Sequence, residues 1–385
     1  MRSALTPVVS GSRAKWQGRV AAIVAVAVIA VAAQPAAATP SSFVGGFNNV
    51  MTLASTVPKS GDVNPYGVAV APVTAGSLAK GDVLVSNFNN HRNLQGTGTT
   101  IVDFSPSSGN VSLFASLDPN KLPGACPGGL GLTTALVALK SGWVIVGSLP
   151  TKNGSSATAQ AGCLLMLDSS GKPVETITGP LVNGPWDMTA LDNGSTADLF
   201  VTNVLNGTVA ASPNTVDEGT VVRIDLKDLN GVKPTVSSET TIGAGFPERT
   251  DPAALVVGPT GLGLAADGAL YVADSGGNRI AKIVDADTTG TASIGGTTVT
   301  SDGALSDPLA LAIAPNGDIL TTNGGDGNLV ETTPAGDQIA VKMLDNSPAP
   351  PGPNGNGTLF GLAVVPGGAG VYFVDDGTNT LNLLH

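Results

Sequence analysis

The amino-acid sequence predicts an all-β protein: a six-bladed β-propeller with four-stranded blades, whose ring is closed by the N-terminal strand pairing with the C-terminal blade. Three observations predict it. A pattern of short apolar runs recurs six times, each recurrence holds three or four β-rich runs, and one spare run precedes the first recurrence. A β-sandwich or barrel is the alternative, but neither explains a strand that is missing at one end and spare at the other.

The first run of each repeat is dominated by Ala, Gly, Val and Leu, as expected where six strands crowd around a central channel. The repeat period is about 50 residues, with insertions in the first half of the chain. The first runs are "YGVAVAP" from Tyr66, "LGLTTAL" from Leu130, "WDMTALD" from Trp186, "TGLGLAAD" from Thr260, "LALAIAP" from Leu309 and "FGLAVVP" from Phe360.

A second run follows each first run after a Gly- or Asp-rich turn, and a third run follows the second. No window supports a long amphipathic helix, so each repeat is a set of strands separated by turns. The second runs are "DVLVSN", "WVIVGS", "DLFVTN", "LYVAD", "DILTTN" and "VYFVDD".

A fourth run completes five of the repeats, for example "VSLFASLDP", "PVETITG" and "QIAVKMLDN". The sixth repeat has no fourth run. The spare run "NVMTLAST" from Asn49 resembles "VSLFASLD" and stands before the first repeat. The two ends of the chain can therefore share one blade and close the ring.

Residues 1–38 are predicted to be a cleaved signal peptide. A basic stretch with Arg2, Arg13, Lys15 and Arg19 precedes the apolar run of residues 20–33, and "AAA" at 36–38 offers small residues for cleavage. A membrane anchor is the alternative, but the run is shorter than the roughly 20 apolar residues that a spanning helix needs. We therefore expect an exported protein, periplasmic or extracellular, that has no membrane span in its mature form.

The mature chain is strongly acidic, because removal of these four basic residues lowers the net charge from −11 to −15. Nucleic acid and anionic lipid are poor partners for such a chain. Cys126 and Cys163 are its two cysteines, and an oxidising compartment lets them form a disulfide; two free thiols are the alternative. We expect a single propeller domain over residues 39–385, acting as a monomer.

The fourth repeat, "GPTGLGLAADGALYVADSGGNRIAKI" from Gly258, resembles an NHL repeat. The pattern is Pro, then Gly and aliphatic residues, Gly, an aliphatic-Tyr-Val-Ala-Asp run, and Asn-Arg-Ile. The fifth and sixth repeats keep this skeleton, whereas the second and third lack the Asn-Arg pair. The resemblance covers residues 45–385 and implies an NHL-type propeller, related in fold to the gluconolactonase-like propellers. NHL propellers include protein-binding modules, lactonases and lyases, so the resemblance selects no activity.

Polar residues end the second strands, on the propeller face that usually binds ligands. Asn and Asp close tight turns through their own backbone, which is one interpretation. A ring of such oxygens can also hold Ca²⁺ or another divalent cation. In gluconolactonase-like propellers a carboxylate after a second strand helps bind a catalytic metal, and this resemblance implies Asn203, Asp274 and Asp375 as ligands. The polar residues at the ends of the six second strands are Asn87, Ser148, Asn203, Asp274, Asn323 and Asp375.

Histidine is scarce, because His91 and His385 are the only two. A site built on three histidines cannot be assembled from them. His91 and Arg92 lie in the polar loop "SNFNNHRNLQG", and together with Asn87 and Asn203 we predict that they contact a ligand. A solvated loop is the alternative for His91. Tyr66, Trp186 and Phe360 start equivalent first runs, either as packing residues between blades or as a stacking platform.

The predicted function is that of an exported binding module, without catalysis of its own, whose loop-rich face takes an unknown protein or small-molecule ligand. The loops from Asn87 to Thr99, Ser148 to Gly162 and Asn203 to Gly219 are long, whereas the equivalent loops of the last three repeats are short. The alternative is a divalent-metal-dependent hydrolase of the lactonase type, with its site at the channel mouth. A structural or adhesive propeller is a third class.

Overall fold

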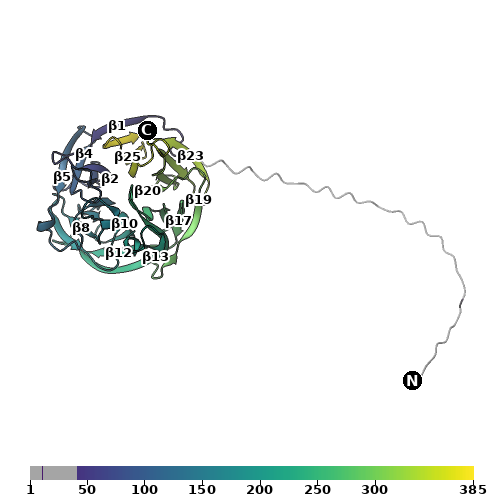
Figure 1. Ribbon diagram of the computed structural model, residues 1–385, viewed down its shortest axis with the longest axis horizontal. Helices are drawn as coiled ribbons and strands as arrows, with labels where there is room; N and C mark the ends of the chain where they lie inside the picture. The colour runs from purple at the N-terminus through teal and green to yellow at the C-terminus, as the bar shows by residue number, and fades with distance from the viewer. Residues whose placement is uncertain (1–10, 12–40) are drawn as a thin grey trace, which may run out of the picture. The chain divides into compact units, whose positions relative to one another are not determined.

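The computed structural model describes Gly11 and residues 41–385, and the latter form a six-bladed β-propeller around a central channel (Figure 1). The predicted signal peptide lies outside the described residues. Blade 1 comprises β2 (Val63–Val70), β3 (Val83–Asn89), β4 (Thr100–Ser105) and β5 (Asn110–Ser116). Blade 2 comprises β6 (Leu132–Ala138), β7 (Val144–Ser148), β8 (Cys163–Leu167) and β9 (Pro173–Ile177). Blade 3 comprises β10 (Pro185–Asp192), β11 (Ala197–Asn203), β12 (Val216–Lys227) and β13 (Thr235–Asp251).

The second half of the ring repeats this order. Blade 4 comprises β15 (Pro259–Leu264), β16 (Leu270–Asp274), β17 (Arg279–Ile283) and β19 (Thr297–Ser301). Blade 5 comprises β20 (Pro308–Ile313), β21 (Ile319–Asn323), β22 (Asn328–Thr332) and β23 (Gln338–Met343). Blade 6 comprises β24 (Leu359–Val364), β25 (Val371–Asp375), β26 (Thr380–Leu384) and β1 (Val50–Ser55).

The predicted closure of the ring is confirmed. Strand β1 pairs antiparallel with β26, from Val50 opposite Leu384 to Ser55 opposite Thr380. The pairing continues beyond the strands, because the amide of His385 donates to the carbonyl of Asn49 at 2.9 Å. The spare run at the start of the repeats is thus the outer strand of the last blade (Figure 1).

Blade 3 is larger than the repeat predicts. Strand β13 is 17 residues long and turns back into β14 (Leu255–Val257), and β18 (Ser293–Ile294) pairs with it in parallel. Because β12 begins at Val216, the third long loop covers residues 204–215 and ends before the predicted Gly219.

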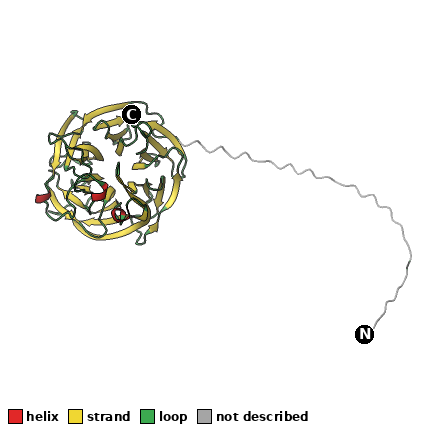
Figure 2. Ribbon diagram, in the orientation of Figure 1, coloured by secondary structure: helices red, strands yellow, loops and turns green. Residues whose placement is uncertain are grey.

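In the described part of the chain, helix is confined to three short turns, and the predicted lack of a long amphipathic helix holds there (Figure 2). These are η1 (Pro119–Lys121), η2 (Ser156–Thr158) and α1 (Thr208–Ala211). Within residues 41–385, then, there is no helix with the length and apolar character to span a membrane.

Adjacent blades are joined near the channel by hydroxyl groups. The Ser86 hydroxyl of blade 1 donates to the Thr133 carbonyl of blade 2 at 2.7 Å. Equivalent bonds join blades 3 and 4, where Thr202 donates to Thr260 O at 2.9 Å, and blades 5 and 6, where Thr322 donates to Phe360 O at 3.0 Å. These bonds satisfy buried carbonyls of the inner strands, which have no further strand on the channel side.

The inner strands approach one another so closely that some positions need glycine. A Cβ at Gly361 of blade 6 would lie 2.1 Å from the carbonyl oxygen of Tyr66 in blade 1. A Cβ at Gly261 would lie 2.4 Å from the Leu309 carbonyl oxygen of the next blade. This crowding explains the small residues of the predicted first runs.

The chain enters the propeller through a clamp on a buried carboxylate. The side chain of Glu331 on β22 accepts the Ser42 hydroxyl at 2.5 Å and the amides of Phe43 and Val44 at 2.6 and 2.9 Å. Phe43 and Val44 also join the apolar core between blades 5 and 6. The segment that precedes β1 is therefore part of the folded domain.

Candidate functional site

The loops leave the ring on two faces, because the four strands of each blade are antiparallel. One face carries the connections from second to third strand and from blade to blade. We call residues 90–99, 149–162, 204–215 and 251–255 on this face the crown. The opposite face carries the turns from first to second strand, and we call it the turn face. The predicted contrast in loop length is confirmed, since blades 4 to 6 have only residues 275–278, 324–327 and 376–379 at the crown-equivalent positions.

The six polar residues predicted at the ends of the second strands are all buried. Five of them end their strands, whereas Asn87 lies within β3, which continues to Asn89. In blades 1, 2, 3 and 5 they bond the connection that enters the same blade. The Asn87 amide donates to Thr56 O at 3.0 Å, and the Asn323 amide donates to Ala304 O at 2.8 Å. The Asn203 side-chain oxygen accepts the Gly184 amide at 3.3 Å. Asn87 and Asn203 thus hold the connections that enter their blades, and their role as ligand contacts stays a prediction.

Asp274 closes a turn and holds an arginine. Its Oδ1 accepts the Gly277 amide at 3.0 Å, and its Oδ2 accepts Nε of Arg279 at 2.8 Å. Burial raises the pKa of Asp274, and the neighbouring Arg279 opposes that rise. Both carboxylate oxygens are therefore engaged within the "VADSGGNR" turn of blade 4.

Asp375 lies in blade 6 and performs a similar local role, because its Oδ1 accepts the Thr378 amide at 3.1 Å. Burial raises its pKa. The predicted metal ligands Asn203, Asp274 and Asp375 end strands of three different blades. In the described part of the chain no three His, Cys, Asp or Glu side chains gather closely enough to hold a metal ion. This ligand set stays a prediction.

His91 and Arg92 are exposed on the crown. The Asn90 side chain accepts the Arg92 amide at 2.9 Å and shapes the turn that presents them. Of the four residues predicted to contact a ligand, these two face solvent.

The crown loops are bonded to one another. Gln95 of the first loop donates to the Ala253 carbonyl of the β13–β14 hairpin at 3.0 Å. Its own carbonyl accepts the Thr151 hydroxyl of the second loop at 2.6 Å. The disulfide between Cys126 and Cys163 confirms the predicted pairing and ties the connection between blades 1 and 2 to the start of β8. The built-up half of the face is a single cross-linked surface.

Apolar side chains fill the channel beneath the crown. Tyr66 stacks between Phe88 and Phe360, with ring centroids 4.5 and 4.1 Å away, and Trp186 meets it edge-on at 5.7 Å. These aromatic residues are packing residues, as one of the two interpretations predicted. Leu149, Val204, Leu255 and Val256 cover them and are themselves at most 1% exposed. These apolar side chains are therefore buried beneath the crown and are not a surface for stacking.

Glu248 is a buried carboxylate that the sequence analysis did not identify. Its Oε1 accepts the Asn206 amide at 2.7 Å, whereas its Oε2 is buried without a hydrogen-bond partner among the described residues. Burial raises the pKa of Glu248 to about 8, and the nearby charge of Glu218 adds to this rise. Glu248 lies among the turn residues of "GAGFPERTD", where no periodic pattern marks it.

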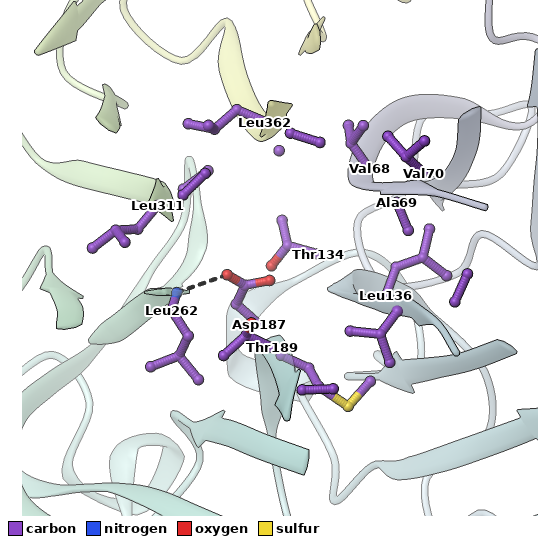
Figure 3. A pocket seen from close by; sticks show the side chains of 18 of the residues that line it. Val68, Ala69, Val70, Thr134, Leu136, Asp187, Thr189, Leu262, Leu311 and Leu362 are labelled. Carbon is purple, nitrogen blue, oxygen red and sulfur yellow. Dashed lines mark hydrogen bonds between the residues drawn. The ribbon is translucent and has the colours of Figure 1, made fainter. Parts of the chain in front are cut away.

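At the other end the channel is open. A cavity of about 340 Å³ lies between the last residues of the inner strands and opens on the turn face (Figure 3). Asp187 of β10 lies at its inner end, and its Oδ2 accepts the Leu262 amide of β15 at 2.9 Å. Burial raises the pKa of Asp187 to about 7. The sequence did carry a signal for Asp187, because Gly or Ala takes its place in the other five first runs.

No known family profile matches the sequence. No curated protein matches it either. Among solved structures, similarity is found to a gluconolactonase of Xanthomonas campestris, with 13% identity, a TM-score of 0.53 and coverage of 87% of this chain and 88% of that one. A streptogramin B lyase has 17% identity, a TM-score of 0.50 and coverage of 88% and 97%. Regucalcin, a calcium-binding protein of Agrobacterium tumefaciens, has 14% identity, a TM-score of 0.50 and coverage of 86% and 92%. At these identities the similarity shows the six-bladed fold alone.

Proposed function

We propose that the protein is an exported, monomeric binding module whose crown docks a protein partner. The observation that carries this proposal is the construction of the crown end. The first two long loops and the hairpin are bonded to one another, and the third loop is bonded to β13 through Ser212 and Thr250, above a channel mouth filled by apolar side chains. Such a face offers a continuous surface, which suits a macromolecule better than a small molecule that needs a concave site.

Preorganisation supports the same proposal. Loops that are already ordered lose little conformational entropy when a partner binds. The disulfide fixes the connection between blades 1 and 2, and it also supports export, since disulfides persist in oxidising compartments. Loops that are fixed in this way keep the shape of the surface before a partner binds.

The chemistry of the surface is polar and adaptable. Exposed side chains on the crown include His91, Arg92, Lys152, Asn153 and Asn214. Amide and guanidinium groups recognise partners through directional hydrogen bonds. Arg92 and Lys152 are cationic side chains of these loops in a protein of net charge −11, and each can pair with an acidic or carbonyl group of a partner.

The experiment compares crown and turn-face variants of the whole protein. Arg92→Glu and Asn153→Arg change exposed crown residues, and Asp267→Arg changes an exposed residue of the turn face. Proteins of the extracellular fraction are cross-linked to each variant and identified by mass spectrometry, and dissociation constants are then measured with the recovered partner. We expect the crown variants to weaken binding about 10-fold or more, and Asp267→Arg to leave it unchanged. Equal binding by all variants would refute the proposal.

A second candidate is the divalent-metal-dependent hydrolase, favoured by one observation. The buried Oε2 of Glu248 has no partner, and the Asn206 that bonds Oε1 also donates to the Asn203 carbonyl at 3.3 Å. A cation here would satisfy the carboxylate. Melting temperatures with EDTA, Ca²⁺, Mg²⁺ or Zn²⁺ test it, because a cation at 100 times its dissociation constant stabilises by about 2.7 kcal/mol. A rise that Glu248→Gln abolishes and Asp274→Asn preserves would support this site; no rise with any cation would contradict it.

A further inference from the structure

We propose that the cavity on the turn face binds a small organic cation, a primary ammonium group on a compact apolar body, with the Asp187 carboxylate as its partner. This site lies at the opposite end of the channel from the crown. It does not depend on the function proposed for the crown.

The Asp187 carboxylate is held by backbone amides and faces the cavity (Figure 3). Its Oδ2 accepts the Leu262 amide at 2.9 Å. Burial raises the pKa of Asp187 and hydrogen bonding by the Leu262 and Met188 amides opposes that rise, whereas no basic side chain among the described residues pairs with it. The Thr134 hydroxyl beside it donates to the Trp186 carbonyl, so its oxygen lone pairs remain able to accept. An ammonium group needs acceptors of this kind.

The side chains that line the cavity across from Asp187 are aliphatic, although polar atoms also contribute to its surface. Val68, Leu136, Leu311 and Leu362 are among them (Figure 3). The volume of about 340 Å³ lies at the lower end of the range for small-molecule sites. An apolar body of modest size therefore fits the wall, while its charged end reaches the carboxylate.

The acidic residues that line the cavity favour a ligand with a positive charge. Among the described residues that line it, Asp187 and Asp192 are charged and none is basic. Asp192 is already engaged, because its Oδ2 accepts the Lys140 amide at 2.5 Å. Asp187 is thus the acidic group available to a ligand, and an anion would meet no cation.

A structural role does not account for the negative charge. A side-chain amide would accept the Leu262 amide equally well, and the equivalent positions in other blades hold Gly67, Gly261 and Gly361. A carboxylate that is removed from water without an ion-pair partner costs free energy, and burial accordingly raises the pKa of Asp187 to about 7. One carboxylate matches one positive charge, whereas Ca²⁺ takes six to eight oxygen ligands.

The test is calorimetric titration at pH 8 with n-hexylammonium, using hexanol and hexanoate as probes of the same body without the positive charge. We expect hexylammonium to bind more tightly than either. Asp187→Asn keeps the acceptor for the Leu262 amide and should weaken hexylammonium binding about 10- to 100-fold. Asp267→Asn removes the same charge from an exposed turn of the same face and should leave binding unchanged.

Two further measurements keep the test independent of folding. Thr189→Phe fills the cavity between Asp187 and its opening and should abolish binding with Asp187 intact. Affinity should fall about tenfold per pH unit below pH 7, as Asp187 takes up a proton, and the fall should be absent in Asp187→Asn. Equal binding of hexanol, undiminished binding by Asp187→Asn, or displacement of hexylammonium by Ca²⁺ at equal concentration would overturn the proposal.

Discussion

The two ends of the channel are built from the same six repeats and differ in every respect that matters for binding. At the crown end, loops and a hairpin are bonded together over buried aromatic side chains. At the turn face, short turns leave a cavity with Asp187 at its inner end. The crown end offers a continuous surface, and the turn face offers a cavity.

This difference shows that a propeller can acquire a binding surface through insertions in its loops and a binding cavity through substitutions in its inner strands. The crown arises from insertions in blades 1 to 3, where loops are free to grow because they lie outside the strand pairing. The cavity depends on single residues of the inner strands, because no loop reaches it. Insertions set the shape of one end, and substitutions set the chemistry of the other.

The largest expected effect comes from a substitution in the aromatic cluster beneath the crown. Trp186→Ala removes a side chain that is 1% exposed and touches the Tyr66 ring, so we expect unfolding in urea to lose about 3–5 kcal/mol. Hydrogen exchange of the Leu255 and Val256 amides should accelerate as well, because these residues cover the aromatic cluster. Trp143→Ala, in the core between blades 2 and 3, is the control: it should cost similar stability without that local acceleration.

Removal of the disulfide should have the next largest effect. Cys126 and Cys163 close a loop with a sequence separation of 37 residues, and the double replacement by Ser should cost about 2–4 kcal/mol in urea denaturation. We expect loosening of the crown, seen as faster proteolysis near Cys126, with hexylammonium binding at the turn face unchanged. Weaker binding at both ends would contradict the independence of the two sites.

The pH dependence of stability sharpens the comparison, because buried carboxyls lie near both ends. Burial raises the pKa of Asp187 and Asp376 to about 7 and that of Glu248 to about 8. Each folded-state pKa lies above its unfolded value, so the stabilisation is complete below about pH 4 and is lost as pH rises towards 8. Urea denaturation should give several kcal/mol more stability at pH 5.5 than at pH 8, with about 2 kcal/mol of the difference from Asp187. Asp187→Asn should reduce this difference, and an unchanged or reversed difference would show that Asp187 does not contribute to it.

The smallest effect concerns a single bond of the crown. Gln95→Ala removes the hydrogen bond to the Ala253 carbonyl, an exposed contact, so we expect a loss of about 0.5–1 kcal/mol in urea denaturation. Asn214→Ala, an exposed crown residue, serves as the control and should change stability less. A loss of several kcal/mol would mean that Gln95 holds more of the crown than this one bond.

The repeat pattern predicted the fold because strand alternation and turn residues are local signals. The six blades follow from such signals, closure by residues 50–55 follows from comparing the first and last repeats, and the Cys126–Cys163 pair follows from there being only two cysteines. The apolar cluster beneath the crown could not be predicted in this way, because Leu255 and Val256 join the cluster of Tyr66 only through the hairpin that β13 and β14 form. Glu248 was not predicted either, because no periodic pattern marks it within "GAGFPERTD". Asp187 was visible as the one carboxylate at a Gly or Ala position, but its meaning depends on which end of the channel is open.

Ring closure also has a consequence for the order in which the protein is assembled. Strand β1 emerges first from the ribosome, yet its pairing partner β26 ends at Leu384. Blades 1 to 5 can form in sequence from neighbouring segments, whereas the last blade must wait for the final strand. Until then β1 has no neighbour in its sheet, and the apolar faces of blades 1 and 6 that meet around Tyr66 and Phe360 stay uncovered. A chain that lacks β26 would therefore leave β1 and these apolar faces without partners, and exposed surface of this kind is what chaperones recognise.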